Sequence, residues 1–166
     1  MHASLPPRRA LSIALSMLLF PALPALAQQV VADGDDQIPA AGDYTTTDPV
    51  EPGNPAGYAF HALNGGTIVP AGEVNLRTEG MRAAAVRVEG AGSHVALTGG
   101  SIVTTGYGAA GVSIAGGGAA TLTGTRIETE GQASFGIGIE GGTLEASNVH
   151  ICLLYTSLMA RGRRVD

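Results

Sequence analysis

The residues that could do chemistry in this chain are few, and two glutamates are the first to consider. Polysaccharide-cleaving enzymes use paired or clustered carboxylates, either as acid and base or as calcium ligands. Glu89 and Glu140 occupy equivalent positions two steps apart in a sequence repeat, which separates them by about 9 to 10 Å if the repeats stack at strand spacing. No Asp lies between Asp48 and Asp166. We therefore interpret both glutamates as solvent-facing turn residues rather than as a glycosidase pair.

Histidine and cysteine offer no better site. His61, His94 and His150 do not fall at matching positions of the repeat, so each is interpreted as a surface or turn residue and not as part of a metal-binding triad. The single cysteine, Cys152, excludes an internal disulfide and a CxxC motif. Glycine-rich runs could suggest a phosphate-binding loop, but the chain has no lysine to complete one. The sequence accordingly assigns no catalytic, cofactor-binding or metal-binding residue.

The elements that would position such residues follow from the repeat itself. Three six-residue blocks, at 85–90, 111–116 and 136–141, superimpose at steps of 26 and 25 residues. Within each block the apolar residues alternate, which is the two-residue period of a strand with one buried face. The predicted core ladders are Val86, Val112 and Ile137; Val88, Ile114 and Ile139; and Leu76, Ile102 and Ile127, with Val149 expected next on the last wall.

Short strands that return every 25 residues predict an all-β fold, a right-handed single-stranded parallel β-helix. Glycines Gly65, Gly90, Gly116 and Gly141 stand where the chain must turn tightly between strands. The threonines Thr78, Thr104 and Thr129 are also in step with the repeat.

Between residues 28 and 151 the chain is acidic, with four arginines and thirteen carboxylates. This negative charge disfavours nucleic acid as a partner.

Four segments are predicted along the chain. Residues 1–27 combine paired arginines, an apolar stretch and an Ala-Leu-Ala site, which indicates a signal peptide cleaved between Ala27 and Gln28 by the secretion machinery. Residues 28–56 lack apolar periodicity and are expected to form an acidic extended lead-in or cap. Residues 57–151 carry the coils, which we expect to be truncated. The segment 152–166 begins with Cys-Leu-Leu-Tyr-Thr-Ser, resembles translated sequencing-adapter sequence, and is expected to be a non-native tail.

The export signal, the glycine- and threonine-rich coils such as Ala-Ala-Gly-Val-Ser-Ile-Ala-Gly-Gly-Gly, and the near absence of cysteine together resemble the N-terminal part of a pertactin-like autotransporter passenger. That resemblance implies transit through the periplasm of a Gram-negative bacterium. It implies display at the cell surface by a C-terminal β-barrel translocator missing from this sequence. It also implies a non-enzymatic adhesin or host-interaction scaffold, with no cofactor and with a host surface receptor as the possible partner.

An alternative remains open. Pectin-lyase-like carbohydrate-active enzymes share the right-handed β-helix, so the chain could be the N-terminal part of such an enzyme whose active coils lie further on. Clustered Asp and Arg on one sheet downstream would favour the enzyme. A barrel of alternating lipid-facing apolar residues would favour the passenger.

Overall fold

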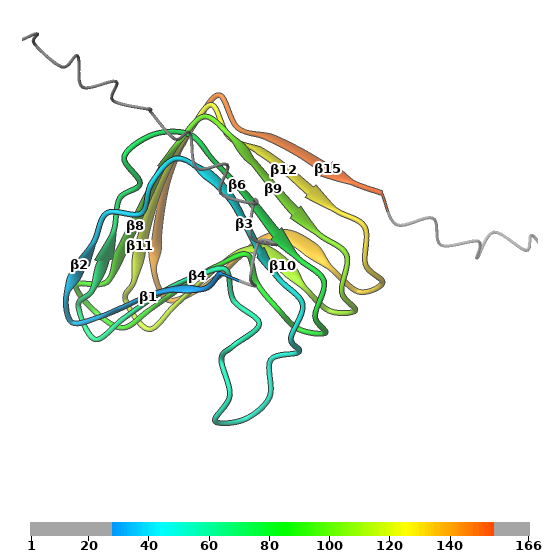
Figure 1. The fold of residues 1–166 in the computed structure, drawn as a ribbon, viewed down its shortest axis with the longest axis horizontal. Helices are drawn as coiled ribbons and strands as arrows, with labels where there is room; N and C mark the ends of the chain where they lie inside the picture. Colours follow the sequence, from blue (N-terminus) through cyan, green and yellow to red (C-terminus); the bar gives the residue numbers. More distant parts are fainter. Residues whose placement is uncertain (1–27, 155–166) are drawn as a thin grey trace, which may run out of the picture.

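The computed structural model describes residues 28–154 as a stack of short strands that form three parallel sheets around one core (Figure 1). Sheet A contains β1 (Val30–Asp33), β4 (Phe60–Leu63), β7 (Val86–Glu89), β10 (Ala110–Ala115) and β13 (Phe135–Glu140). Sheet B contains β2 (Asp36–Gln37), β5 (Thr67–Ile68), β8 (His94–Thr98), β11 (Ala119–Thr123) and β14 (Thr143–Ser147). Sheet C contains β3 (Gly42–Thr46), β6 (Val74–Thr78), β9 (Ser101–Thr104), β12 (Arg126–Thr129) and β15 (His150–Leu153).

The chain visits sheets A, B and C in turn, five times, so that each round makes one coil of a three-sided prism (Figure 1). Successive coils are held in parallel register, with Phe60 beside Val86, Val86 beside Val112, and Val112 beside Ile137. These are the positions that the 25- and 26-residue steps align, and no helix occurs in residues 28–154. The predicted parallel β-helix is therefore confirmed. Within the same residues, no helix is long and apolar enough to cross a membrane.

Residues 28–56 contribute more than the predicted lead-in or cap. Strands β1, β2 and β3 pair with β4, β5 and β6, so this segment supplies a complete first coil. Tyr44 fills the core of that coil and packs edge-on against Phe60, with ring centroids 5.1 Å apart. The apolar period is hidden because the inward positions of these strands include Ala32 and Thr46 as well as Tyr44. A loop between β3 and β4 also makes the coil longer than the others and projects from the prism (Figure 1).

The core ladders lie inside the prism as expected in the interior coils. Val86, Val88, Val112, Ile114, Leu76, Ile102 and Ile127 are all buried. The last coil of the described residues, β13 to β15, has a neighbouring coil on one side only. Ile137 is only partly buried there and Ile139 is 47% exposed, so these two predicted core residues are only half covered.

The third wall of the core ends on a different residue from the one expected. Ile151, and not Val149, is the register partner of Ile127. Val149 precedes β15 and packs against the core from there, partly buried. Strand β15 also continues through Cys152 and Leu153, which pair with β12 beyond the predicted end of the coils at residue 151. The predicted signal peptide, residues 1–27, and the remaining tail, residues 155–166, lie outside the described residues.

Glycine and threonine shape the corners between the sheets. The predicted corner glycines adopt positive φ, for example +60° at Gly116, where a side chain would be strained. Gly106 is required for a different reason, since a Cβ there would overlap the Gly80 carbonyl oxygen of the preceding coil. The threonines Thr78, Thr104 and Thr129 stack in register and are buried. Small residues at these corners let successive coils approach to strand spacing.

Opposite faces of β10 provide a test of the register. Val112→Asp places an unpaired carboxylate in the core and should lower the free energy of unfolding by several kcal/mol. Ser113→Ala, on the outward face of the same strand, should cost roughly 1 kcal/mol or less. Urea unfolding followed by circular dichroism measures both values, and equal tolerance of the two substitutions would contradict the observed register.

Candidate functional site

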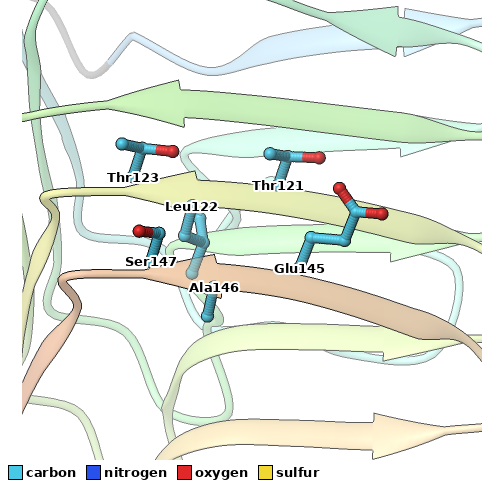
Figure 2. A pocket seen from close by; sticks show the side chains of 6 residues that line it. All are labelled: Thr121, Leu122, Thr123, Glu145, Ala146 and Ser147. Carbon is cyan, nitrogen blue, oxygen red and sulfur yellow. The ribbon is translucent and has the colours of Figure 1, made fainter.

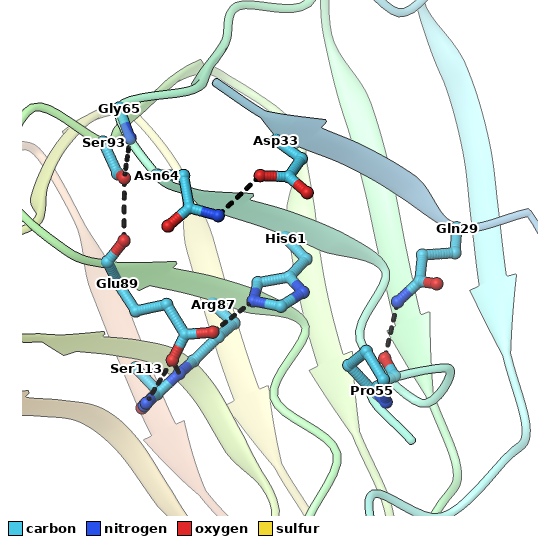
Figure 3. Close-up of polar contacts among 10 residues, drawn as sticks. All are labelled: Gln29, Asp33, Pro55, His61, Asn64, Gly65, Arg87, Glu89, Ser93 and Ser113. Carbon is cyan, nitrogen blue, oxygen red and sulfur yellow. Dashed lines mark hydrogen bonds and ion pairs between the residues drawn. The ribbon is translucent and has the colours of Figure 1, made fainter. Parts of the chain in front are cut away.

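The most concentrated polar cluster of the described residues lies on the outer face of sheet A. Because side chains alternate along a strand, the inward positions Phe60 and Val86 leave His61 and Arg87 on the outer face, side by side in register. Glu89 follows Arg87 by two residues and so returns to the same face. Ser113 on β10 is the next register partner of Arg87. Four side chains from three neighbouring coils therefore meet (Figure 3).

Glu89 is the centre of this cluster. Its Oε1 lies 2.7 Å from His61 Nε2, and its Oε2 accepts hydrogen bonds from Arg87 Nη2 at 2.9 Å and Arg87 Nε at 3.3 Å. Arg87 Nη1 also donates to Ser113 Oγ at 2.7 Å, which carries the network to the next coil (Figure 3). Both carboxylate oxygens of Glu89 are thus engaged by cationic or imidazole nitrogens.

The loop between β3 and β4 covers one side of the cluster. The ring of Tyr58, at the end of this loop, packs edge-on against His61 with centroids 5.0 Å apart. The loop is held in place by Gln29 Nε2, which donates to the Pro55 carbonyl at 2.6 Å (Figure 3). Thr46 Oγ1 also donates to the Gly57 carbonyl, at 2.6 Å. As a result His61 is only 3% exposed, and its Nδ1 is buried without a protein partner.

The interpretation of His61 as a surface or turn residue was therefore wrong. Its strand position is outward, as the alternation indicates, but the loop covers it. The sequence did contain a signal for the pairing with Glu89, because adding one 26-residue step to His61 reaches Arg87, two residues from Glu89 on the same face. No periodicity in residues 47–59 indicated that the loop would fold over this position.

Two groups of the cluster have shifted pKa values. Burial tends to raise the pKa of the Glu89 carboxyl, but the hydrogen bonds from His61 and Arg87 and the charge of Arg87 outweigh it and hold the pKa below its ordinary value. Burial raises the pKa of the Tyr58 hydroxyl; the charge of Arg87 opposes that shift and the charge of Glu89 adds to it. Glu89 is therefore held as a carboxylate at neutral pH.

The geometry of this cluster suits hydrogen bonding between adjacent coils better than it suits catalysis. A general acid needs a carboxyl that keeps its proton near neutral pH, and the shift of Glu89 is in the opposite direction. The imidazole is covered by Tyr58, which limits access of a substrate. The same bonds join β4, β7 and β10, and they fix the outer face of sheet A across three coils.

The other residues considered in the sequence lie apart from this cluster. Glu140 is the second register step from Glu89, through Ala115, and is exposed on β13. His94 lies on sheet B, with Nε2 3.1 Å from Thr121 Oγ1, and His150 lies exposed on sheet C. Cys152 is a free, partly buried thiol on β15. Among residues 28–154, no group of three His, Cys, Asp or Glu side chains is placed to hold a metal ion.

Sheet B carries two shallow depressions. One, of about 180 Å³, is lined by hydroxyl and carboxylate groups from β11 and β14, namely Thr121, Thr123, Glu145 and Ser147, together with Leu122 and Ala146 (Figure 2). The other, of about 320 Å³, lies beside Val69, Glu73 and Thr98. Such groups could hydrogen-bond a polar surface, but neither depression encloses the His61–Glu89 cluster.

Comparison with known proteins finds no match: no family model, no curated protein and no solved structure matches this chain.

The shifted carboxyl predicts a pH-dependent stability. The pKa of Glu89 is lower in the folded state than its ordinary value of 4.5. The Glu89 carboxylate therefore adds to the free energy of unfolding above pH 4.5, and this addition is lost as the pH falls through the folded-state pKa. Glu89→Gln should lower the free energy of unfolding by roughly 1 kcal/mol at neutral pH, and the difference from the wild type should shrink as the pH falls below 4.5. Urea titrations at several pH values measure this. Glu140→Gln, at the equivalent exposed position, is the control and should change little; a constant difference for Glu89→Gln would contradict the assignment.

Proposed function

We propose that the chain is part of a surface-displayed autotransporter passenger that acts as a non-enzymatic scaffold, an adhesin or host-interaction protein. The parallel β-helix is consistent with this function, although carbohydrate-active enzymes use the same fold. The predicted signal peptide, with cleavage between Ala27 and Gln28, supports export. The receptor would be a molecule of the host surface.

The observation that carries the proposal is the polar outer face of sheet C. Asn75 Nδ2 donates to Asp43 Oδ1 at 2.8 Å, and Ser101 Oγ donates to Asn75 Oδ1 at 2.8 Å, so one row of polar side chains runs across β3, β6 and β9. Arg126 continues this row on β12 and pairs with Glu128 at 3.1 Å. An extended face of ordered donors and acceptors suits contact with a broad surface rather than enclosure of a small substrate.

The glutamates of sheet A favour the passenger over its alternative. A β-helix enzyme would bring carboxylates together around a substrate, as acid and base or as calcium ligands. In this chain the two glutamates at equivalent positions differ, since Glu89 is bonded to His61 and Arg87 while Glu140 is exposed. This difference favours a structural role for Glu89 and supports the scaffold over the enzyme.

Export can be tested in a Gram-negative host. With the full chain fused ahead of an autotransporter β-barrel, we expect the N-terminus of the displayed product to be Gln28 and the coils to be accessible to added protease on intact cells. N-terminal sequencing and protease shaving measure these two results. Ala27→Asp should block cleavage while leaving the coils unchanged. Retention of Met1, or protection of the wild-type coils, would contradict the proposal.

The choice between scaffold and enzyme needs a paired assay. Cells that display the chain should adhere to host cells, and Asn75→Arg, which disrupts the row on sheet C, should reduce adhesion. Ala119→Arg, on the outer face of sheet B and outside its depressions, is the matched control and should leave adhesion unchanged. The purified chain should release no product from pectin or other uronic-acid polymers. Turnover that is lost in Glu89→Gln or Glu140→Gln would overturn the scaffold in favour of the carbohydrate-active enzyme.

A further inference from the structure

The larger depression on sheet B comes from an irregularity in the second coil. There the strand β5 has only two residues, and its connection to β6 takes residues 69–73. In the next two coils the strands β8 and β11 have five residues each, and the connections shorten to residues 99–100 and 124–125. The longer connection of the second coil forms a wall beside the outer face of β8. The depression, of about 320 Å³, is lined by this wall and by that face.

The wall is apolar and is fixed to the coil before it. Val69, Pro70 and Ala71 line the depression, and Val69 is 42% exposed. The Val69 N–H donates to the Gln37 carbonyl at 3.0 Å, and the Ala71 N–H donates to the Pro39 carbonyl at 2.9 Å. The ring of Pro70 restricts the backbone between these two bonds. The wall is therefore preformed, and a ligand that packs against it need not order it first.

The floor of the depression is small and carries one hydroxyl group. Ala96 and Thr98 of β8 line it. In the next coil the register partners of these two residues are Thr121 and Thr123. Alanine at position 96 therefore leaves room that a threonine occupies one coil further on. The result is an apolar floor beside the wall, with the Thr98 hydroxyl at one side of it.

A single carboxylate, Glu73, supplies the charge of the depression. Its side chain lies against Gly99, where a Cβ would overlap the carboxyl group. Among the described residues that line the depression, none is basic. Three other glutamates, Glu79, Glu89 and Glu128, are each paired with an arginine, but no salt bridge within residues 28–154 involves Glu73. The depression thus offers an unpaired negative charge beside an apolar surface, which is complementary to a cation on an aliphatic stem.

We propose that this depression binds a lysine side chain of a partner protein. The aliphatic part of the lysine packs on Ala96 and against Val69, and its ammonium group donates to the Glu73 carboxylate and to the Thr98 hydroxyl. The site lies apart from the polar row of sheet C, on another sheet, and does not rest on the proposed surface function.

The placement of the two acceptors favours lysine over arginine. Glu73 belongs to the wall and Thr98 to the floor, so the acceptors approach the cation from different elements. The three donors of an ammonium group diverge and can reach both, whereas the donors of a guanidinium group lie in one plane and match a single carboxylate. The chain itself contains no lysine, so a second copy cannot provide this ligand.

A titration of the isotope-labelled full chain with Nα-acetyl-lysine amide, followed by nuclear magnetic resonance, tests the site. We expect saturable shifts of the backbone amides of residues 69–73 and 96–99, with a Kd on the order of 10 mM for one exposed ion pair and a short apolar stem. Nα-acetyl-norleucine amide has a similar aliphatic stem without the charge and should bind roughly fivefold more weakly. Nα-acetyl-arginine amide should also bind more weakly than the lysine probe.

Three results of this titration would overturn the proposal. Shifts that do not saturate, or that spare residues 69–73, would remove the site. Equal binding of the norleucine probe would remove the ion pair with Glu73. Equal or tighter binding of the arginine probe would contradict the choice of lysine.

Variants separate the charge of the site from its shape. Glu73→Gln keeps the shape and should weaken binding of the lysine probe roughly fivefold. Ala96→Leu fills the floor from an outward position of β8 and should weaken binding at least as much. Glu145→Gln is the matched control, because Glu145 is a carboxylate on the same face of sheet B without the apolar wall, and it should leave the titration unchanged.

Circular dichroism checks that each variant keeps its β-structure, which we expect because both altered side chains point outward. Binding that survives either Glu73→Gln or Ala96→Leu unchanged would overturn the proposed contacts. Weakening by Glu145→Gln as large as that by Glu73→Gln would show a general attraction to the acidic surface and would also overturn the site.

Discussion

The fold depends on one constraint, the fixed register between successive coils. Each strand is stabilised by backbone hydrogen bonds to the coil before and after it, and the same register stacks the apolar side chains inside the prism. A slip of one residue would turn Val112 and Ile114 outward and bring Ser113 into the core. The corner residues serve the same constraint, because Gly106 allows the chain to approach the Gly80 carbonyl as closely as strand spacing demands. Core, corners and outer rows therefore all follow from the repeat.

This constraint explains how much of the fold was predictable. Where a coil uses Val, Ile or Leu at its inward positions, as around Val86 and Val112, the alternation and the 26-residue step indicated both strand and register. The first coil was missed because its inward positions include small or polar residues and its length differs. The end coil was partly misjudged for another reason: periodicity indicates that Ile139 points inward, but it does not indicate whether another coil covers it.

The polar cluster on sheet A shows a second limit of sequence reasoning. The repeat places His61 and Arg87 side by side, and the two-residue period places Glu89 on the same face. The pairing of His61 with Glu89 was therefore predictable from the sequence. The burial of His61 could not be read in this way, because it depends on an irregular loop that packs Tyr58 against the imidazole. Loops of this kind carry no period, and their packing is decided by local bonds such as Gln29 to Pro55.

A linear stack also separates the stability of the fold from its possible contacts. In a solenoid each coil contacts only its neighbours, so stability is close to a sum of coil and interface terms, and the terminal coils are the exceptions. Tyr44 shows how a coil whose other inward residues are small or polar is filled by one large side chain, which packs against Phe60 and bonds to its own loop. In the interior coils the same space is filled by Val, Ile and Leu side chains, such as Val112, Ile114 and Ile127. Stability therefore follows from the inward faces and the shared register, whereas contacts with other molecules depend on the outward rows, such as that of Asp43, Asn75 and Ser101, which can vary without disturbing the core.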